Sequence, residues 1–409
     1  MTVFQARHCL GAVLLLVAAC SPQQASDSRT ESSSKALFAS QPNFGDPLAG
    51  LSADDQARFA AGQEEFASVE TVADGLGPVF NEASCAACHV GPNGAIGGTN
   101  QRLETRFGFR RPFTNKFDPL ANLGGSLLQD RGIGLFNGVN FVAEKVPRIA
   151  NVTTPRRTTP LFGLGLVDAT PSSTFFAIAS SQARNNRSIG GTPSIVTDPI
   201  TGNQVLGKFG WKAQVPSLFV FSGDAYLNEM GITNPIFPNE NCPQGNCALL
   251  AANPVPTLND DGTGVEEFND FMTLLAPPPR GPQSRQTDHG NDVARAIGCL
   301  DCHVQTLRTG PNAVPALDQV AYHPFSDFLL HDMGQLGDGI TQGQATGRLM
   351  RTQPLWGLRT QTQMLHDGSA TTITGAILAH DGQARDSRRQ FERLGFFDRA
   401  ALLAFLNSL

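Results

Sequence analysis

The chain has 409 residues, of which 40% are hydrophobic, and this is enough to build the cores of two domains. Its net charge is −6 and it has no long run of Lys and Arg, which excludes nucleic-acid binding through a basic surface. Beyond the N-terminal region, no apolar stretch is long enough for a transmembrane helix.

The N-terminus has the features of a bacterial secretory signal. Residues 1–19 contain Arg7 and an apolar run too short for a membrane anchor. The run ends in Leu16-Val17-Ala18-Ala19-Cys20, which resembles a lipobox and predicts Cys20 as a lipidated first residue; an ordinary cleaved signal is the alternative. Residues 20–48 are rich in Ser, Gln and Ala, so we expect them to form a flexible tether. Because no Asp follows Cys20, we expect a periplasm-facing protein with its lipid anchor at the outer membrane.

Two short stretches carry the strongest chemical signal, Cys85-Ala86-Ala87-Cys88-His89 and Cys299-Leu300-Asp301-Cys302-His303. Each is a C-x-x-C-H pentapeptide, the attachment sequence of a c-type haem. Two thiols one helical turn apart can bond both vinyl groups of one porphyrin, and the His then ligates the iron. The sequence therefore predicts two covalent haem c groups, with Cys85, Cys88, Cys299 and Cys302 as attachment sites and His89 and His303 as iron ligands.

Two other metal or redox sites use similar cysteine spacings. A thioredoxin-like redox pair needs no His after C-x-x-C, and zinc knuckles bring their halves within a few tens of residues. The remaining pair, Cys242 and Cys247, flanks a turn with Pro and Gly. In an oxidising compartment this spacing indicates a small structural disulfide, with a redox-active pair as the alternative.

The order of elements around the two motifs indicates an internal repeat. Each copy has a lead-in helix, the motif, Gly- and Pro-rich loops, a Pro-Leu-aromatic-Gly-Leu phrase, a short helix and a closing helix. This is the order of a cytochrome c domain, in which the first and last helices cross beside the haem. We predict a mainly α fold of two tandem cytochrome c-like domains, 49–280 and 281–409, with loop-rich and short β insertions.

Local signals predict several boundaries within these copies. Ser52 is the expected N-cap of the first helix, and Thr263 is expected to form a capping box with Glu266. Asp398 is expected to cap the last helix. The short helices are expected at Ser172–Ala179 and Thr372–His380. An insertion is expected near 181–262, with a hairpin turn at Asp198-Pro-Ile-Thr-Gly202.

The sixth ligand of each iron can be sought in the short helices. His380 is the candidate for the second haem, because it projects from an apolar helix end; a buried structural His is the alternative. The repeat places Ser180 or Ser181 at the equivalent position of the first copy, and neither is a usual ligand. The first haem is therefore expected to be open to a small oxidant, with catalysis at the His89 haem; a distal ligand from elsewhere in the chain is the alternative.

Other candidates remain unranked by the sequence. Met333 is either a thioether ligand or part of the core, and either Trp211 or Trp356 could relay electrons between the haems. A distal acid–base group that helps to split an O–O bond is sought among three carboxylates: Glu82, Glu104 and Glu144.

The run from Pro354 to His380 is similar to the closing motif of bacterial di-haem cytochrome c peroxidases and of the related enzyme that matures methylamine dehydrogenase. The whole chain resembles the exported di-haem oxidoreductases, also called "thiol oxidoreductases", through three segments: 77–89, 209–214 and 329–334. In the peroxidases the position matching His380 ligates the C-terminal haem, usually as Met, so a His here implies a lower potential. The resemblance also allows a calcium ion between the domains.

These observations predict a di-haem c-type oxidoreductase of the cytochrome c peroxidase type. A small redox protein or other donor would supply electrons, which pass between the haems and reduce a peroxide at the N-terminal haem. The alternatives are a non-catalytic electron-transfer cytochrome and a haem oxygenase that acts on an apolar organic substrate.

Overall fold

The structure is a computed structural model that describes residues 41–409. The predicted signal, Cys20 and most of the predicted tether lie outside the described residues. The end of that tether is part of the folded protein, however, because Leu48 is buried, its amide donates to Leu274 O, and Phe44 packs against Phe162. The tether therefore ends earlier than residue 48.

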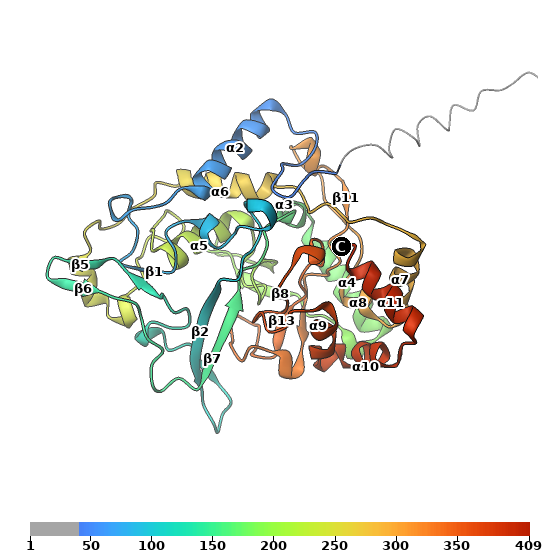
Figure 1. Ribbon diagram of the computed structural model, residues 1–409. Coiled ribbons are helices and arrows are strands. Elements are labelled where there is room, and N and C mark those ends of the chain that lie inside the picture. The colour runs from blue at the N-terminus through green and yellow to red at the C-terminus, as the bar shows by residue number, and fades with distance from the viewer. Residues whose placement is uncertain (1–40) are drawn as a thin grey trace, which may run out of the picture. The chain divides into compact units, whose positions relative to one another are not determined.

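Residues 42–409 form one compact unit in which helices outweigh strands (Figure 1). The α-helices are α2 (Ala53–Ala67), α3 (Leu164–Asp168), α4 (Ser172–Asn185), α5 (Leu218–Met230), α6 (Thr263–Leu274), α7 (Arg285–Ala296), α8 (Cys299–Cys302), α9 (Ile373–Ala379), α10 (Arg385–Arg393) and α11 (Phe396–Leu406). The mainly α prediction is confirmed at this level, and the division into two tandem domains stays a prediction.

The strands are short and form small antiparallel sheets. They are β1 (Val79–Phe80), β2 (Leu103–Arg110), β3 (Phe117–Asp118), β4 (Arg131–Gly132), β5 (Gly134–Phe136), β6 (Val139–Phe141), β7 (Val152–Arg157), β8 (Ser194–Thr197), β9 (Gln204–Gly207), β10 (Leu307–Arg308), β11 (Ala321–Tyr322), β12 (Leu330–Asp332) and β13 (Leu349–Arg351). One sheet has three strands, in the order β3-β2-β7, with Leu103 opposite Arg157. The predicted hairpin at 198–202 joins β8 and β9.

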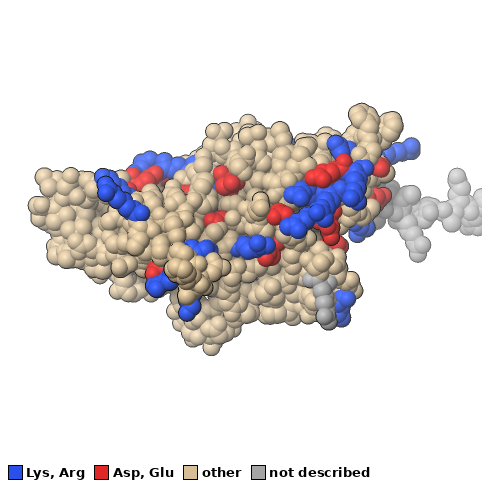
Figure 2. All heavy atoms as spheres, turned by 90° about the horizontal axis from the view of Figure 1, so that it is seen from below, with Lys and Arg blue, Asp and Glu red and all other residues tan. Residues whose placement is uncertain are grey.

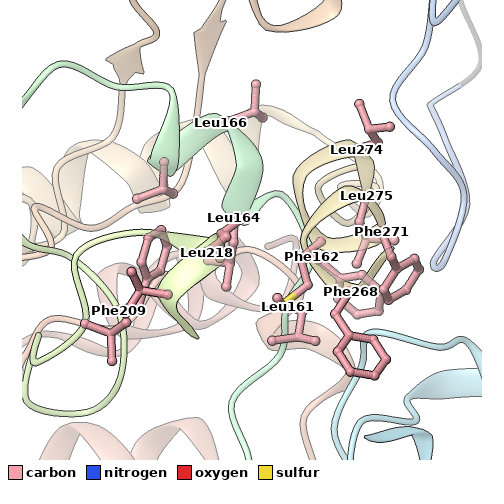
Figure 3. Close-up of a cluster of buried hydrophobic side chains, with 14 of the residues drawn as sticks. Leu161, Phe162, Leu164, Leu166, Phe209, Leu218, Phe268, Phe271, Leu274 and Leu275 are labelled. Carbon is pink, nitrogen blue, oxygen red and sulfur yellow. The ribbon is translucent and has the colours of Figure 1, made fainter. Parts of the chain in front are cut away.

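Two helix pairs are built as the repeat predicts, because α2 packs on α6 and α7 packs on α11 (Figure 1). The buried faces of α6 and the nearby 161–164 segment meet in the main core, where Phe268 and Phe271 lie near Leu161 and Phe162 (Figure 3). This core also contains Trp356 from the second half of the chain. The two halves therefore share apolar packing.

The predicted helix ends are correct in part. Ser52 caps α2, since its Oγ accepts from the Asp55 amide at 3.1 Å. The predicted Thr263 capping box is wrong: the N-cap is Gly262, and the Thr263 hydroxyl donates to the closer Asp261. Asp398 lies inside the first turn of α11 rather than at its cap. The helix that starts at Ser172 continues to Asn185.

Cys242 and Cys247 are joined by a disulfide, with their Cα atoms 4.5 Å apart. Within residues 41–409, none of the helices combines the length and apolar character needed to cross a membrane. On the face drawn in Figure 2, basic and acidic side chains lie beside one another rather than in separate patches of one sign.

Candidate functional site

The first C-x-x-C-H motif forms one turn of 3-10 helix over Cys85–Ala87. The amides of Cys88 and His89 both donate to Cys85 O, at 3.2 and 3.0 Å, and this brings both thiols to one side. The two thiols are unbonded, and with His89 they line a cavity of about 180 Å³. The local geometry is therefore the one that the spacing predicts.

The His89 ring is held in an apolar setting. It meets the Phe66 ring edge-on, with centroids 5.9 Å apart. Burial lowers the pKa of His89 to about 4, and the Gly98 and Thr159 carbonyls offset this only in part. The buried Nδ1 atom has no hydrogen bond of normal geometry. A neutral imidazole is the form that ligates a metal.

The second motif begins α8, which places Cys299, Cys302 and His303 on a second cavity of about 260 Å³. The His303 amide donates to Cys299 O at 3.0 Å. Its Nδ1 lies 2.9 Å from Phe325 O, so this nitrogen serves as a donor and Nε2 is left free. Burial lowers the pKa of His303 to about 4.

His380 lines the same cavity from the end of α9. Its Nδ1 lies 2.8 Å from Ala376 O, so its Nε2 is also free, and burial lowers its pKa. His380 is close enough to depress the pKa of His303 further. The structure thus brings two neutral imidazoles with matching hydrogen bonds into one cavity, which is the arrangement needed to ligate one iron from both sides.

The predicted distal position of the first copy does not lie in the first cavity. Ser180 and Ser181 are on α4, and the next residue, Gln182, donates to Asp301 O and to Asp327 at the second motif. The first copy of the short helix therefore supports the second site, and the repeat alignment gives the wrong location. Even so, among the described residues that line the first cavity, His89 is the sole histidine.

A cluster of buried charges lines the first cavity instead. Glu104 on β2 accepts two hydrogen bonds from Arg106, at 2.9 and 3.3 Å. Glu229 on α5 accepts from the Asn81 amide group at 2.7 Å, and its carboxyl group lies close enough to that of Glu104 for the two to shift each other's pKa. Two neighbouring buried carboxyl groups repel each other when both are ionised, which favours a proton on one of them.

The environment decides which carboxyl group holds that proton. Burial disfavours the Glu104 charge, but Arg106 outweighs it and lowers the pKa of Glu104. Burial raises the pKa of Glu229 to about 8, and the nearby Glu104 charge adds to the rise. Asp224, one turn earlier on α5, has its pKa raised to about 6 by burial. At neutral pH the proton therefore resides on Glu229.

The three carboxylates considered from the sequence have different fates. Glu104 lies in the cluster described above. Glu82 also lines the cavity, but Arg102 and Arg131 each hold it at 2.7 Å. Glu144 is structural, because it accepts from the Gln129 and Gln244 amides away from both cavities. Glu229 was missed, since it lies in a helix that the sequence pattern did not reveal.

Trp211 stands at the junction of the two cavities, because its side chain lines both. Its Nε1 donates to Arg157 O at 2.8 Å, and its ring meets that of His366 edge-on at 6.2 Å. Trp356, by contrast, is a core residue that lines the second cavity and not the first.

Met333, a candidate from the sequence, and His331 border the second cavity. Met333 is half-buried at its edge. His331 is buried and lies 2.8 Å from Asp327, which more than offsets the effect of burial and raises the His331 pKa well above its usual value. The His331 Nδ1 atom lies 3.7 Å from the Cys302 sulfur. Among the described residues, these three side chains (Cys302, Asp327 and His331) group their ligand-type atoms within 4.8 Å.

Both cavities have the donor set that haem requires. Each carries two free thiols at the correct spacing and one neutral proximal imidazole, and the lining of the second cavity is chiefly apolar. A planar porphyrin needs such walls, and its iron needs imidazole nitrogen. The residues therefore fit two haem groups.

Comparison with known proteins supports this chemistry. The family described as "Di-haem oxidoreductase, putative peroxidase" matches residues 149–409. No curated protein sequence matches the chain.

Three solved structures are similar at low identity. Hydrazine synthase from Kuenenia stuttgartiensis has 14% identity and a TM-score of 0.39, over 96% of this chain and 100% of that chain. A MauG-like protein associated with microbial copper homeostasis has 14% identity and a TM-score of 0.38, over 91% and 95%. A variant of the diheme peroxidase BthA from Burkholderia thailandensis has 12% identity and a TM-score of 0.30, over 70% and 93%.

Proposed function

The chain belongs to the di-haem oxidoreductase family, and we propose that it reduces a peroxide at the N-terminal cavity with electrons that enter at the C-terminal cavity. The observation that carries this proposal is the difference between the cavities. The second offers His303 and His380 to one iron, whereas the first pairs His89 with a proton-holding carboxyl cluster.

We further propose that both haems are attached covalently. Cys85 and Cys88 would hold the first, and Cys299 and Cys302 the second, with His89 and His303 as proximal ligands. A bound haem supplies an iron that binds the oxidant and exchanges electrons with it. The protein's part is to hold the ligands neutral, orient them and deliver protons.

His380 gives the second site its proposed role. With Nδ1 held by Ala376 O, the Nε2 atom of the ring is free to ligate an iron in the second cavity, and a ligated His380 would keep a substrate from that side. A six-coordinate site of this kind suits electron transfer. Trp211, which lines both cavities, is the proposed route between the sites.

The first site needs protons as well as electrons, because reduction of hydrogen peroxide to two water molecules consumes two of each. Glu229 is the proposed acid, since it holds a proton at neutral pH and lines the cavity. Arg106 keeps Glu104 ionised, so Glu104 can accept a hydrogen bond from Glu229 and orient its proton. An acid of this kind typically contributes 10²–10⁴-fold to rate, by order of magnitude.

Spectroscopy on the purified protein tests the proposal. We expect two covalent haems per chain, one low-spin ferric signal, and one high-spin signal that changes when peroxide, cyanide or azide is added. The variant His380→Ala should convert the low-spin signal to high-spin. The exposed His289, which pairs with Asp398 at 2.8 Å, provides the control, and His289→Ala should change neither signal.

Two results would contradict the proposed roles of the two haem sites. If both haems are low-spin in every redox state and nothing binds, the protein is an electron-transfer cytochrome. If His380→Ala leaves the low-spin signal intact, the second haem has a different sixth ligand.

We also propose that Cys20 carries a lipid in a periplasm-facing protein. Labelled palmitate should then be incorporated into the wild-type chain and not into the Cys20→Ser variant.

A further inference from the structure

Among the described residues, two buried arginines next to the cavities have no carboxylate in direct contact, although Asp327 acts on the charge of Arg351 from a longer distance. Arg157 is 8% exposed and Arg351 is 5% exposed, and neither forms an ion pair with a described residue. Burial lowers their pKa values, to about 10 and about 9. Both groups therefore remain cations at neutral pH, and a buried unpaired cation is costly.

The adjacent residue shows how the fold treats a cation that it balances internally. Arg156 is buried to a similar degree, and its guanidinium bonds Asp338 at 2.6 Å. Lys212 reaches the other oxygen of the same carboxylate at 2.7 Å. An acidic partner thus bonds these two cations directly. No described carboxylate bonds Arg157 or Arg351 in this way, which indicates that a bonded anion comes from outside the chain.

The hydrogen bonds of the two arginines are incomplete or neutral. Arg157 donates to Gln363 O and to the Gln361 side chain, while its buried Nε has no partner. Arg351 donates to Gly210 O at 2.7 Å and to the Gln353 side chain at 3.0 Å. All of these acceptors are uncharged.

The two arginines occupy the same position of the internal repeat. Arg157-Thr158-Thr159-Pro160-Leu161 corresponds to Arg351-Thr352-Gln353-Pro354-Leu355, directly before the aromatic-Gly-Leu part of the repeated phrase. If each copy holds one cofactor, an arginine with the same task in each copy explains why Arg recurs at this position.

Both arginines also flank Trp211 at the junction of the cavities. Arg157 O accepts from Trp211 Nε1 at 2.8 Å, and the Arg351 amide donates to Trp211 O at 2.9 Å. The Arg157 side chain lines both cavities, and the Arg351 side chain lines the second. A ligand that reaches this junction would meet both cations and the indole together.

We propose that the Arg157 and Arg351 guanidinium groups bind propionate carboxylates of the haems at this junction. The ligand class is a carboxylate on an apolar ring: a porphyrin carries its two propionates on the edge opposite its vinyl groups, and the thiols fix the vinyl edge. The planar fork of Arg matches a carboxylate in two hydrogen bonds. This inference rests on the proposed function only in requiring haem in both cavities.

The test combines three variants with two measurements. Arg157→Gln removes the charge, Arg157→Lys keeps it without the fork, and Arg348→Gln removes an exposed arginine that pairs with Asp332 at 2.9 Å. Resonance Raman spectra report the propionate bending band, and spectroelectrochemical titration reports each midpoint potential. Haem content is measured first on every protein.

We expect Arg157→Gln to retain both haems, to shift the propionate band and to lower a midpoint potential, because a nearby cation favours the reduced haem. Arg157→Lys should restore most of the potential but not the band, and Arg348→Gln should change neither. An unchanged band and potential in Arg157→Gln with full haem content would overturn the inference. Wild-type protein without bound haem would overturn the proposed function itself. If Arg157→Gln does not fold, the same comparison on Arg157→Lys decides, since loss of the fork alone should shift the band.

Discussion

Replacement of Glu229 by Gln should have opposite effects on peroxide reduction and on stability. The amide keeps the shape of the side chain and its hydrogen bond to Asn81 beside Glu104, but it has no acidic proton to give. We expect the rate of peroxide reduction to fall about 10²–10⁴-fold, the usual contribution of a general acid. Haem content and spin states should remain those of the wild type.

The pH profile gives the sharper signature. The pKa of Glu229 is about 8, so the wild-type rate should be level at neutral pH and fall about tenfold per unit well above pH 8, as the proton is lost. The Glu229→Gln variant should lack this step. Glu240 is the matched control, because burial raises its pKa to about 8 as well, yet it lines neither cavity.

Stability should change in the other direction. The folded pKa of Glu229 lies above that of an unfolded Glu, near 4.3, so its protonation stabilises the fold at low pH, and this contribution is lost as pH rises towards 8. Glu229→Gln avoids that loss and should raise the free energy of unfolding at pH 8 by up to about 5 kcal/mol. Urea titrations at pH 5 and pH 8 measure the difference. A variant with the wild-type rate and pH profile would refute the assignment of Glu229 as the acid.

Two other substitutions test the junction and the buried ion cluster. Trp211→Phe should slow electron transfer between the haems in stopped-flow reduction while both haems stay bound, whereas Trp356→Phe should not; equal rates in wild type and Trp211→Phe would exclude the indole route. Asp338→Asn leaves Arg156 and Lys212 buried without a counter-charge and should lower the free energy of unfolding by about 3–5 kcal/mol. A loss below about 1 kcal/mol in urea titration would show that the cluster relaxes or hydrates.

The sequence was most informative where local chemistry decides the structure. The C-x-x-C-H turns form from their own backbone bonds, and Ser52 caps α2 through a residue three positions away. The α2–α6 and α7–α11 pairs follow from amphipathic faces that are visible in the sequence. His380 and His303 share a cavity because α9 closely follows the repeated phrase in the same copy.

The first cavity was harder to predict because its lining breaks the usual patterns. β2 turns Glu104 and Arg106 towards the cavity, so the polar and apolar alternation expected of a strand is absent. α5 is buried on several sides and shows no single apolar stripe. The Glu104–Glu229 contact joins residues distant in sequence, and no local signal specifies such a pairing.

The difference between the two cavities follows from what each copy added to a shared plan. Both copies retain the Arg-Thr-x-Pro-Leu segment, and both place its arginine beside Trp211. The second copy ends its short helix at His380 and places this imidazole in the second cavity. In the first copy that helix, α4, packs at the second motif through Gln182 instead, and the insertion supplies α5. α5 brings Glu229 to the first cavity, which confines the proposed proton donor to that site, whereas Arg157 and Trp211 line both cavities.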